Sequence, residues 1–153
     1  MPKLDAREMQ RFFEEEGLDA DGAMVVEEVG EGEARLRLKA AAKDRRPGGT
    51  VSGASLMALA DLAIYGALLG EIGLVPLAVT TSLTMNFLRK PPLRDVIAHA
   101  RLWKVGRALA FGEILLRSEG DERLVAHATS TYSIPPGAVP AKPKKASNRN
   151  GVS

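Results

Sequence analysis

Cysteine is absent from the sequence, which excludes disulfide bonds, thiolate nucleophiles and cysteine-bound metals. Histidine is scarce, and His99 and His127 lie too far apart for the spacing of metal ligands, so we expect no metal site. The net charge of +2 is too small for the broad basic surface that favours nucleic-acid binding. The N-terminal residues MPKLDAREMQ lack the apolar core of a secretory signal. We therefore expect a cytoplasmic protein without metal, other cofactor or nucleic-acid partner.

Long uninterrupted apolar runs are also missing. The most apolar stretch, residues 50–70, is interrupted by Asp61, its only charged side chain. Its many Ala and Gly residues favour a core helix over a membrane span, so no membrane partner is expected. Because a helix that is apolar on every side is a buried one, we expect a buried helix at about residues 53–70, capped by Thr50 or Ser52. A lone carboxylate there is costly unless it is paired or used, which makes Asp61 a candidate functional residue.

The remaining residues predict short elements of one α+β domain, residues 1–134. Helical periodicity predicts an amphipathic helix at residues 4–16, and alternating apolar residues predict strands. The strands are expected at residues 23–29, 34–40, 77–88, 96–105, 109–117 and 124–134. Short turns join the last four, which indicates an antiparallel meander in a single sheet packed on the long helix. Residues 135–153, rich in Pro, Lys and Asn, are expected to form a disordered or loosely packed basic tail.

Three segments have a distinctive sequence: GGTVSGASLMALADLA at residues 48–63, TTSLTMNFLRKP at 80–91 and AHATSTYSI at 126–134. Together they resemble the phenylacetyl-CoA thioesterase-like (PaaI-like) branch of the hotdog-fold acyl-CoA thioesterases. The order of the elements over residues 23–134 agrees with this family. The resemblance implies a hotdog fold, in which an antiparallel sheet wraps around one long central helix. It also places Asp61 on the family's catalytic carboxylate.

The resemblance assigns further catalytic residues and shows one departure. Gly53 and Ala54 fall on the family's Gly-Gly turn at the start of the central helix, but Ser52 stands where many members have His. Arg46 stands near the place of a loop Asn that is common in the family. Ser82 aligns with a hydroxyl residue that some members place near the catalytic water, and strand alternation puts it on the same face as Thr80.

Thioester hydrolysis needs a donor for the carbonyl oxygen and a nucleophile. Free N–H groups of Gly53 or Ala54 at a helix start suit the developing oxyanion. Asp61 suits the role of general base or nucleophile. A structural alternative also stands for each residue. Gly53 and Ala54 would then only allow close packing, Asp61 would be satisfied by a neighbouring Thr, and Ser82 would be an ordinary strand hydroxyl.

Basic residues at strand ends suit the phosphates of coenzyme A. Arg89 and Lys90 end one predicted strand and Arg107 lies at the turn after the next. The loop at residues 43–49, KDRRPGG, contributes Gly49, where the backbone can approach a ligand closely. With Arg46 from the same loop, these residues are the predicted substrate-binding set.

The sequence thus predicts an acyl-CoA thioesterase that releases a carboxylic acid and free coenzyme A. A hotdog protein that binds acyl-CoA without turnover, as a sensor or carrier, stays open because of the departure at Ser52. A hydratase would need a His near the carboxylate, and neither His99 nor His127 lies on or just before the central helix. A scaffold without a ligand is the third alternative.

Assembly follows from the spacing of Gly53 and Asp61, which are eight residues apart in the sequence. On one helix this spacing separates them by about 12 Å along the axis, too far for both to act on one thioester. We therefore expect a homodimer in which the helix start of one chain faces Asp61 of the other. The resemblance adds that such dimers often pair into dimers of dimers.

Overall fold

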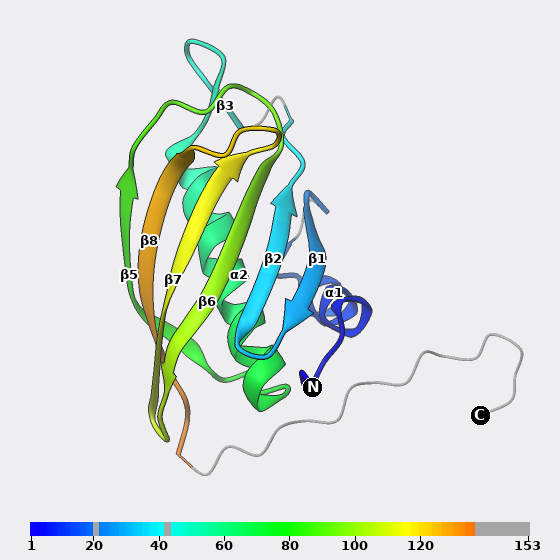
Figure 1. Cartoon of the computed structure of the whole chain (residues 1–153). Coiled ribbons are helices and arrows are strands. Elements are labelled where there is room, and N and C mark those ends of the chain that lie inside the picture. The colour runs from blue at the N-terminus through cyan, green and yellow to red at the C-terminus, as the bar shows by residue number, and fades with distance from the viewer. Residues whose placement is uncertain (20–21, 42–43, 137–153) are drawn as a thin grey trace, which may run out of the picture.

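The computed structural model describes residues 1–19, 22–41 and 44–136, so the predicted tail lies almost entirely outside the described residues. Two helices and eight strands make up this part of the chain (Figure 1). The helices are α1 (Ala6–Glu15) and α2 (Gly53–Ile72), and the strands are β1 (Met24–Gly30), β2 (Glu33–Leu38), β3 (Arg45–Arg46), β4 (Thr50–Val51), β5 (Val79–Phe87), β6 (Val96–Val105), β7 (Leu109–Ser118) and β8 (Leu124–Ser133).

Six of the strands form one antiparallel sheet in the order β1-β2-β6-β7-β8-β5. The helix α2 lies across one face of this sheet (Figure 1). Strand alternation provides that face, because every second residue of β7 and β8, and of the first half of β6, points inward and is buried. Many of these residues are Ala, so the helix can approach closely. The arrangement confirms the predicted α+β hotdog fold. The meander predicted for the last four strands is correct for β6, β7 and β8 and wrong for β5, which pairs with β8 at the edge of the sheet and not with β6.

Gly112 on β7 shows how close this approach is. A Cβ at this position would collide with the Arg101 carbonyl oxygen and would lie 2.8 Å from Cδ1 of Ile64 on α2. Only a residue without a side chain therefore fits between the helix and the β6–β7 pair. The glycine sets the distance between the two layers at this point.

The helix α2 is buried less evenly than the sequence predicts. From Leu62 to Gly70 every residue is buried. Over the most apolar 18-residue stretch of the helix, 67% is buried inside the protein. Its first half, however, exposes Ala54, Met57 and Ala58, which lie on one side of the helix at spacings of three and four residues. The prediction of a helix buried on every side is wrong for this half, since no described element of the chain covers that side.

The helix α1 closes one edge of the core. Asp5 and Glu8 form a capping box at its start, in which each side chain accepts a hydrogen bond from the other residue's backbone N–H. Met9, Phe12 and Phe13 are buried, and the ring centroids of Phe12 and Phe13 lie 6.3 and 6.1 Å from that of Tyr65 on α2. The amphipathic helix predicted at residues 4–16 thus packs against both β1 and the central helix.

The segment before α2 is more regular than the predicted loop at residues 43–49. Arg45–Arg46 and Thr50–Val51 pair as the small antiparallel hairpin β3–β4. Gly48 and Gly49 make its turn with φ angles of 95° and 77°, a backbone region that other residues rarely adopt. The glycines that prevent a long strand therefore allow a tight turn, which holds the segment against the start of α2.

Candidate active site

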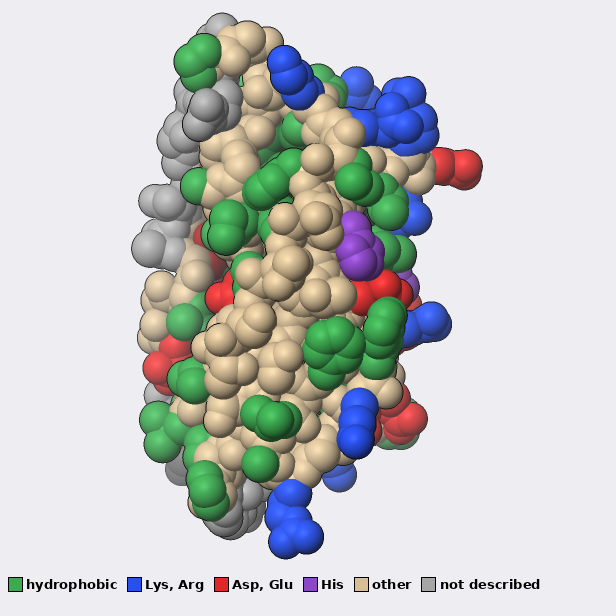
Figure 2. Space-filling model, turned by 90° about the vertical axis from the view of Figure 1, so that its left-hand side faces the viewer, with side chains coloured by type: hydrophobic (Ala, Val, Ile, Leu, Met, Phe, Trp, Pro, Cys, Tyr) green, Lys and Arg blue, Asp and Glu red, His purple; other side chains and the backbone are tan. Residues whose placement is uncertain are grey.

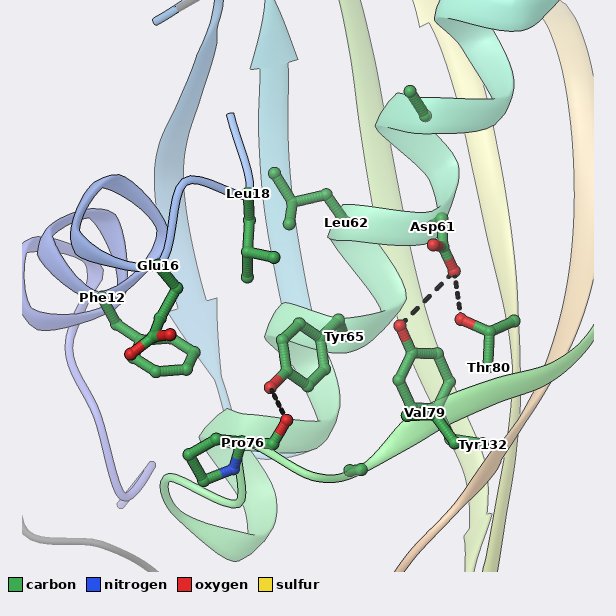
Figure 3. A pocket seen from close by; sticks show the side chains of 12 residues that line it. Phe12, Glu16, Leu18, Asp61, Leu62, Tyr65, Pro76, Val79, Thr80 and Tyr132 are labelled. Carbon is green, nitrogen blue, oxygen red and sulfur yellow. Dashed lines mark hydrogen bonds between the residues drawn. The ribbon is translucent and has the colours of Figure 1, made fainter. Parts of the chain in front are cut away.

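The carboxylate of Asp61 is held by two hydroxyl groups from different strands. Thr80 on β5 donates a hydrogen bond of 2.6 Å from Oγ1 to Asp61 Oδ1, and the Tyr132 hydroxyl on β8 donates a longer one of 3.4 Å to the same oxygen (Figure 3). Asp61 is half-buried rather than fully buried. Among the described residues, Oδ2 has no recorded hydrogen-bond partner. The two hydroxyls therefore fix the carboxylate and leave one oxygen available to a water molecule or a substrate.

Thr80 reaches Asp61 because β5 contains a bulge. In the pairing with β8, Thr80 lies opposite Tyr132 and Ser82 lies opposite Thr131, so Thr81 is the extra residue. The bulge reverses the alternation: Thr80 points to α2, whereas Ser82 is exposed. The predicted common face of Thr80 and Ser82 is wrong for this reason. In the described chain, Asp61 has no recorded contact with Ser82, its predicted neighbour in the site.

Tyr132 and Tyr65 lie side by side below Asp61. Their ring centroids are 5.5 Å apart, and the ring planes differ by only 14°. Burial raises the pKa of Tyr132 above its ordinary value, and burial followed by the charge of Glu16 raises the pKa of Tyr65 to about 12. Both phenols therefore stay protonated at neutral pH, and Tyr132 remains a hydrogen-bond donor to the Asp61 carboxylate.

Asp61 and its partners line an open cavity of about 440 Å³. This volume is within the usual range for small-molecule sites. The lining comes from α1 and its following turn, from α2, and from β5 and β8 with the segment before β5 (Figure 3). The residues are Phe12, Glu16, Leu18, Ala58, Asp61, Leu62, Tyr65, Pro76, Ala78, Val79, Thr80 and Tyr132. A mostly apolar cavity with one fixed carboxylate suits an apolar group next to a reacting bond.

At the start of α2, Ser52 is the N-cap; of the two residues predicted for this role, Thr50 belongs to β4 instead. Its Oγ accepts a 3.1 Å hydrogen bond from the Ser55 N–H and donates a 2.9 Å hydrogen bond to Ser55 Oγ. Ser55 Oγ in turn donates to Oδ1 of the buried Asp44 at 2.8 Å, while the Ser52 N–H donates to the Asp44 carbonyl oxygen at 2.6 Å. The hydroxyl of Ser52 is therefore occupied in holding the start of the helix.

The next two residues present their backbone N–H groups at the start of the helix. Gly53 and Ala54 occupy the first turn, where backbone N–H groups have no partner within the helix. No acceptor is recorded for either group in the described part of the chain. The helix dipole adds a partial positive charge here. This geometry fits the predicted oxyanion donors.

A second cavity, of about 420 Å³, opens at the same helix start. It brings Gly53 together with Arg89 and Lys90, three of the predicted site residues, beside the exposed ring of Phe87. Gly49 lies in the adjoining turn of β3–β4, where its carbonyl oxygen accepts a 3.0 Å hydrogen bond from the Leu93 N–H. The remaining lining residues are Pro47, Gly48, Thr50, Val51, Leu56 and Pro91. The backbone of Arg46 belongs to the same hairpin, but its side chain lies outside the described structure.

Arg107 lies elsewhere. It is in the turn between β6 and β7, next to Leu109 at the start of β7. Leu109 pairs with Ser133 on β8, and Ser133 pairs on its other side with Val79 at the start of β5. Arg89 and Lys90 follow the opposite end of β5. A strand of nine residues is roughly 30 Å long, so one chain does not bring Arg107 to the other two basic residues.

Sequence reasoning predicted Asp61, Gly53 and Ala54 as site residues and, as the structural alternative, a neighbouring Thr beside Asp61, which the structure shows to be Thr80. It named neither Tyr132 nor Asp44. Tyr132 belongs to a strand in which every second residue is buried, so alternation alone indicates that it points inward. No sequence signal gives its contact with Asp61, because that contact depends on how β8 pairs with β5. The same applies to Thr80, whose direction is set by the bulge.

Comparisons with known proteins identify the family. A profile of the thioesterase superfamily matches residues 48–125, which include α2 and β5 to β7. The crystal structure of a protein from Silicibacter sp. TM1040, provisionally named a thioesterase, superposes with a TM-score of 0.82; the sequences are 44% identical over 89% of this chain and 95% of that one. Among curated proteins, no match was found.

Two PaaI proteins are also similar in structure. A variant of the phenylacetic acid degradation protein PaaI from Thermus thermophilus is 28% identical, with a TM-score of 0.66 over 82% of this chain and 99% of that one. The E. coli PaaI protein has the same fold at 20% identity, with a TM-score of 0.70 over 83% of this chain and 95% of that one. The predicted PaaI-like hotdog resemblance is confirmed, and the chain belongs to the thioesterase superfamily.

Proposed function

We propose that the protein is an acyl-CoA thioesterase in which Asp61 of one chain acts on a thioester bound at the α2 start of another. The observation that carries this proposal is the fixed carboxylate of Asp61, which has one free oxygen and lines an apolar cavity. The cavity beside Gly53, Arg89 and Lys90 supplies the second part of the site. Its positive charge suits the phosphates of coenzyme A, and its free N–H groups suit a carbonyl oxygen.

In this reaction the N–H groups of Gly53 and Ala54 hold the thioester oxygen as it becomes an oxyanion. The free oxygen of Asp61 attacks the carbonyl carbon, or takes a proton from a water molecule that attacks it. The carbon–sulfur bond then breaks and coenzyme A leaves as its thiol, with a proton that comes from water. In the first route this leaves an acyl–Asp61 anhydride, which water hydrolyses to free the Asp61 carboxylate. Water supplies the oxygen of the released carboxylic acid, so the overall reaction consumes one water and yields one acid and one thiol.

The separation of the two parts supports a homodimer. Gly53 and Asp61 are about 12 Å apart along one helix, so a second chain has to bring its Asp61 to the first chain's helix start. The helix offers the exposed side with Ala54, Met57 and Ala58 for close approach. The strand β5 is an edge of the sheet and exposes Val79 and Phe87, at 56% and 52%. Edge strands of this kind readily pair with another strand.

The face that contains β5 agrees with such pairing. Figure 2 looks onto this side of the molecule, where hydrophobic side chains and uncharged surface occupy the middle and Lys and Arg lie along one margin and at the two ends. Two copies related by a two-fold axis could pair their β5 strands in antiparallel orientation and place their α2 helices side by side. Each dimer would then contain two equivalent sites, and pairs of dimers could assemble further.

The direct test compares the wild-type protein with Asp61→Asn on a panel of acyl-CoA thioesters. The panel includes phenylacetyl-CoA, because two similar proteins are named for phenylacetic acid degradation. We expect thiol release by the wild type and none by Asp61→Asn, with a melting temperature that stays the same or rises, since the neutral amide costs less to desolvate. Equal activity of the two proteins would refute the role of Asp61. Loss of both activity and folding would indicate a structural role.

The shared site is tested by mixing two inactive variants. Gly53→Trp blocks the helix start, since even a Cβ there would lie 3.3 Å from the Phe87 ring. Mixed with Asp61→Asn under conditions in which subunits exchange, it should restore one intact site per mixed dimer. Exchange is verified with differently tagged chains. No recovery despite proven exchange, or a fully active monomer, would contradict the shared site.

The second candidate function is acyl-CoA binding without turnover. It is favoured by Ser52, whose hydroxyl is occupied in the helix cap rather than available to a substrate. This candidate predicts that acyl-CoA raises the melting temperature of the wild type without any release of thiol. Thiol release that depends on Asp61 would exclude it.

A further inference from the structure

The N-terminal segment contributes directly to the cavity of Asp61, although more than forty residues separate them in the sequence. Phe12 and Glu16 come from the end of α1 and its cap, and Leu18 comes from the following turn. Figure 3 shows these three side chains on the opposite side of the cavity from Asp61 and Thr80. The segment therefore forms the wall that a group extending away from the carboxylate would meet.

Aromatic rings connect the two sides of the cavity. Tyr132 contacts Asp61, Tyr65 lies 5.5 Å from Tyr132, and Phe12 lies 6.3 Å from Tyr65, as measured between ring centroids. Along α2, Tyr65 is one turn beyond Asp61, about 6 Å further on the axis. An acyl group whose carbonyl lies at Asp61 would pass Tyr65 and end against Phe12 and Leu18.

The charges of the lining are all of one sign. Among the described residues around this cavity, Asp61 and Glu16 are the only charged ones, and neither Lys nor Arg is present. Glu16 is exposed at the far wall, close enough for its charge to contribute to the raised pKa of Tyr65. A carboxylate at the end of an acyl group would therefore meet a like charge and no compensating cation.

From this arrangement we propose that the N-terminal segment selects the acyl group: Leu18 and Phe12 limit its length, and Glu16 rejects acyl groups that end in a carboxylate. The substrate class is then the CoA thioesters of uncharged, apolar acids. This inference rests on the proposed function, and it adds residues that the thioester chemistry itself does not require.

The length limit is tested at Leu18, which is 45% exposed, so that its replacement should leave the fold intact. Leu18→Trp fills the far end, and Leu18→Ala enlarges it. On a series of straight-chain acyl-CoAs, the Trp variant should lower kcat/KM by about tenfold or more for the longest chain that the wild type accepts. The reason is that one methylene group that no longer fits an apolar pocket changes kcat/KM by about that factor. Acetyl-CoA should be almost unaffected. The Ala variant should shift the preference towards longer chains.

The charge selection is tested at Glu16 with succinyl-CoA and adipoyl-CoA against uncharged acyl-CoAs of the same length. Glu16→Gln should raise kcat/KM for the carboxylate-ended substrates, and Glu16→Lys should raise it further, by about tenfold at low salt. The effect should shrink at high salt, since the site is open to solvent. Glu31→Lys is the matched control, because it makes the same charge change at the exposed β1–β2 turn, which lines neither cavity.

The outcomes separate this inference from the proposed function. Each acyl-CoA is also titrated calorimetrically into Asp61→Asn, alone and combined with each variant, so that the cavity is tested even in the absence of turnover. Preferences that shift with Leu18 and Glu16 in binding or hydrolysis support the inference. A wild type that hydrolyses acyl-CoAs, with variants that keep the same preferences, would overturn the inference and leave the proposed function standing. Absence of hydrolysis with shifted binding preferences would refute the thioesterase alone.

Discussion

Thr80→Val removes the shorter of the two hydrogen bonds to the proposed catalytic carboxylate and changes little else. Valine has nearly the same shape as threonine and retains its preference for strands. The lost group is the hydroxyl that donates to Asp61 Oδ1 at 2.6 Å, which leaves only the 3.4 Å contact from Tyr132. The carboxylate should then rotate more freely, so that its free oxygen is less often aimed at the substrate. Thr80 thus acts as a positioning residue.

The expected magnitude follows from the type of hydrogen bond. Bonds to charged groups contribute about 1.5–3 kcal/mol. Because Asp61 is only half-buried, water can partly replace the hydroxyl, so the lower end of that range applies. Since about 1.4 kcal/mol corresponds to a factor of ten, kcat should fall by about tenfold. KM for acyl-CoA should change little, because Thr80 lies outside the cavity that contains Arg89 and Lys90.

The assay is thiol release under saturating and limiting acyl-CoA, together with melting temperature, for Thr80→Val, Thr80→Ser and Ser82→Ala. Thr80→Ser retains the hydroxyl and should recover most of the lost rate, which a purely structural role would not require. Ser82→Ala should lose less than Thr80→Val, since the bulge in β5 turns Ser82 away from α2. A greater loss at Ser82 than at Thr80, or no loss at Thr80, would refute the reasoning from this geometry.

Two further predictions concern the substrate and the fold. Replacing both Arg89 and Lys90 with Ala should raise KM for acyl-CoA several-fold and leave kcat nearly unchanged, because phosphate contacts bind ground and transition states alike. The kinetics with a thioester that lacks the nucleotide should not change. Arg107→Ala, at the other end of the sheet, should raise KM less. Gly112→Ala should lower the free energy of unfolding by about 1–3 kcal/mol, because its Cβ would collide with the Arg101 carbonyl oxygen. Chemical denaturation measures this loss. Gly120→Ala is the control, because it adds backbone strain without a steric clash. Equal losses of stability at the two glycines would contradict the close packing of α2 on the sheet.

The sequence by itself determined the class of fold and the central carboxylate. An Ala- and Gly-rich stretch with one charge predicts a core helix, and in the structure this stretch forms α2. Alternation and short turns similarly predict strands and the meander β6-β7-β8, because the direction of a side chain from a strand depends mainly on its own chain. They do not predict the place of β5, which pairs with β8 instead of with the next strand, β6. The N-cap at Ser52 is local for the same reason, since its hydrogen bond reaches only three residues ahead.

Only the tertiary structure decided which groups surround Asp61. Thr80 points to it because β5 gains one extra residue against β8, and such a bulge depends on the pairing of two strands that are distant in the sequence. The wall formed by Leu18, and the position of Arg107 away from Arg89, likewise depend on how whole elements pack. Local patterns record which way a side chain leaves its own strand or helix. They do not record which side chain from another element it meets there, because that is decided by register and packing across the entire domain.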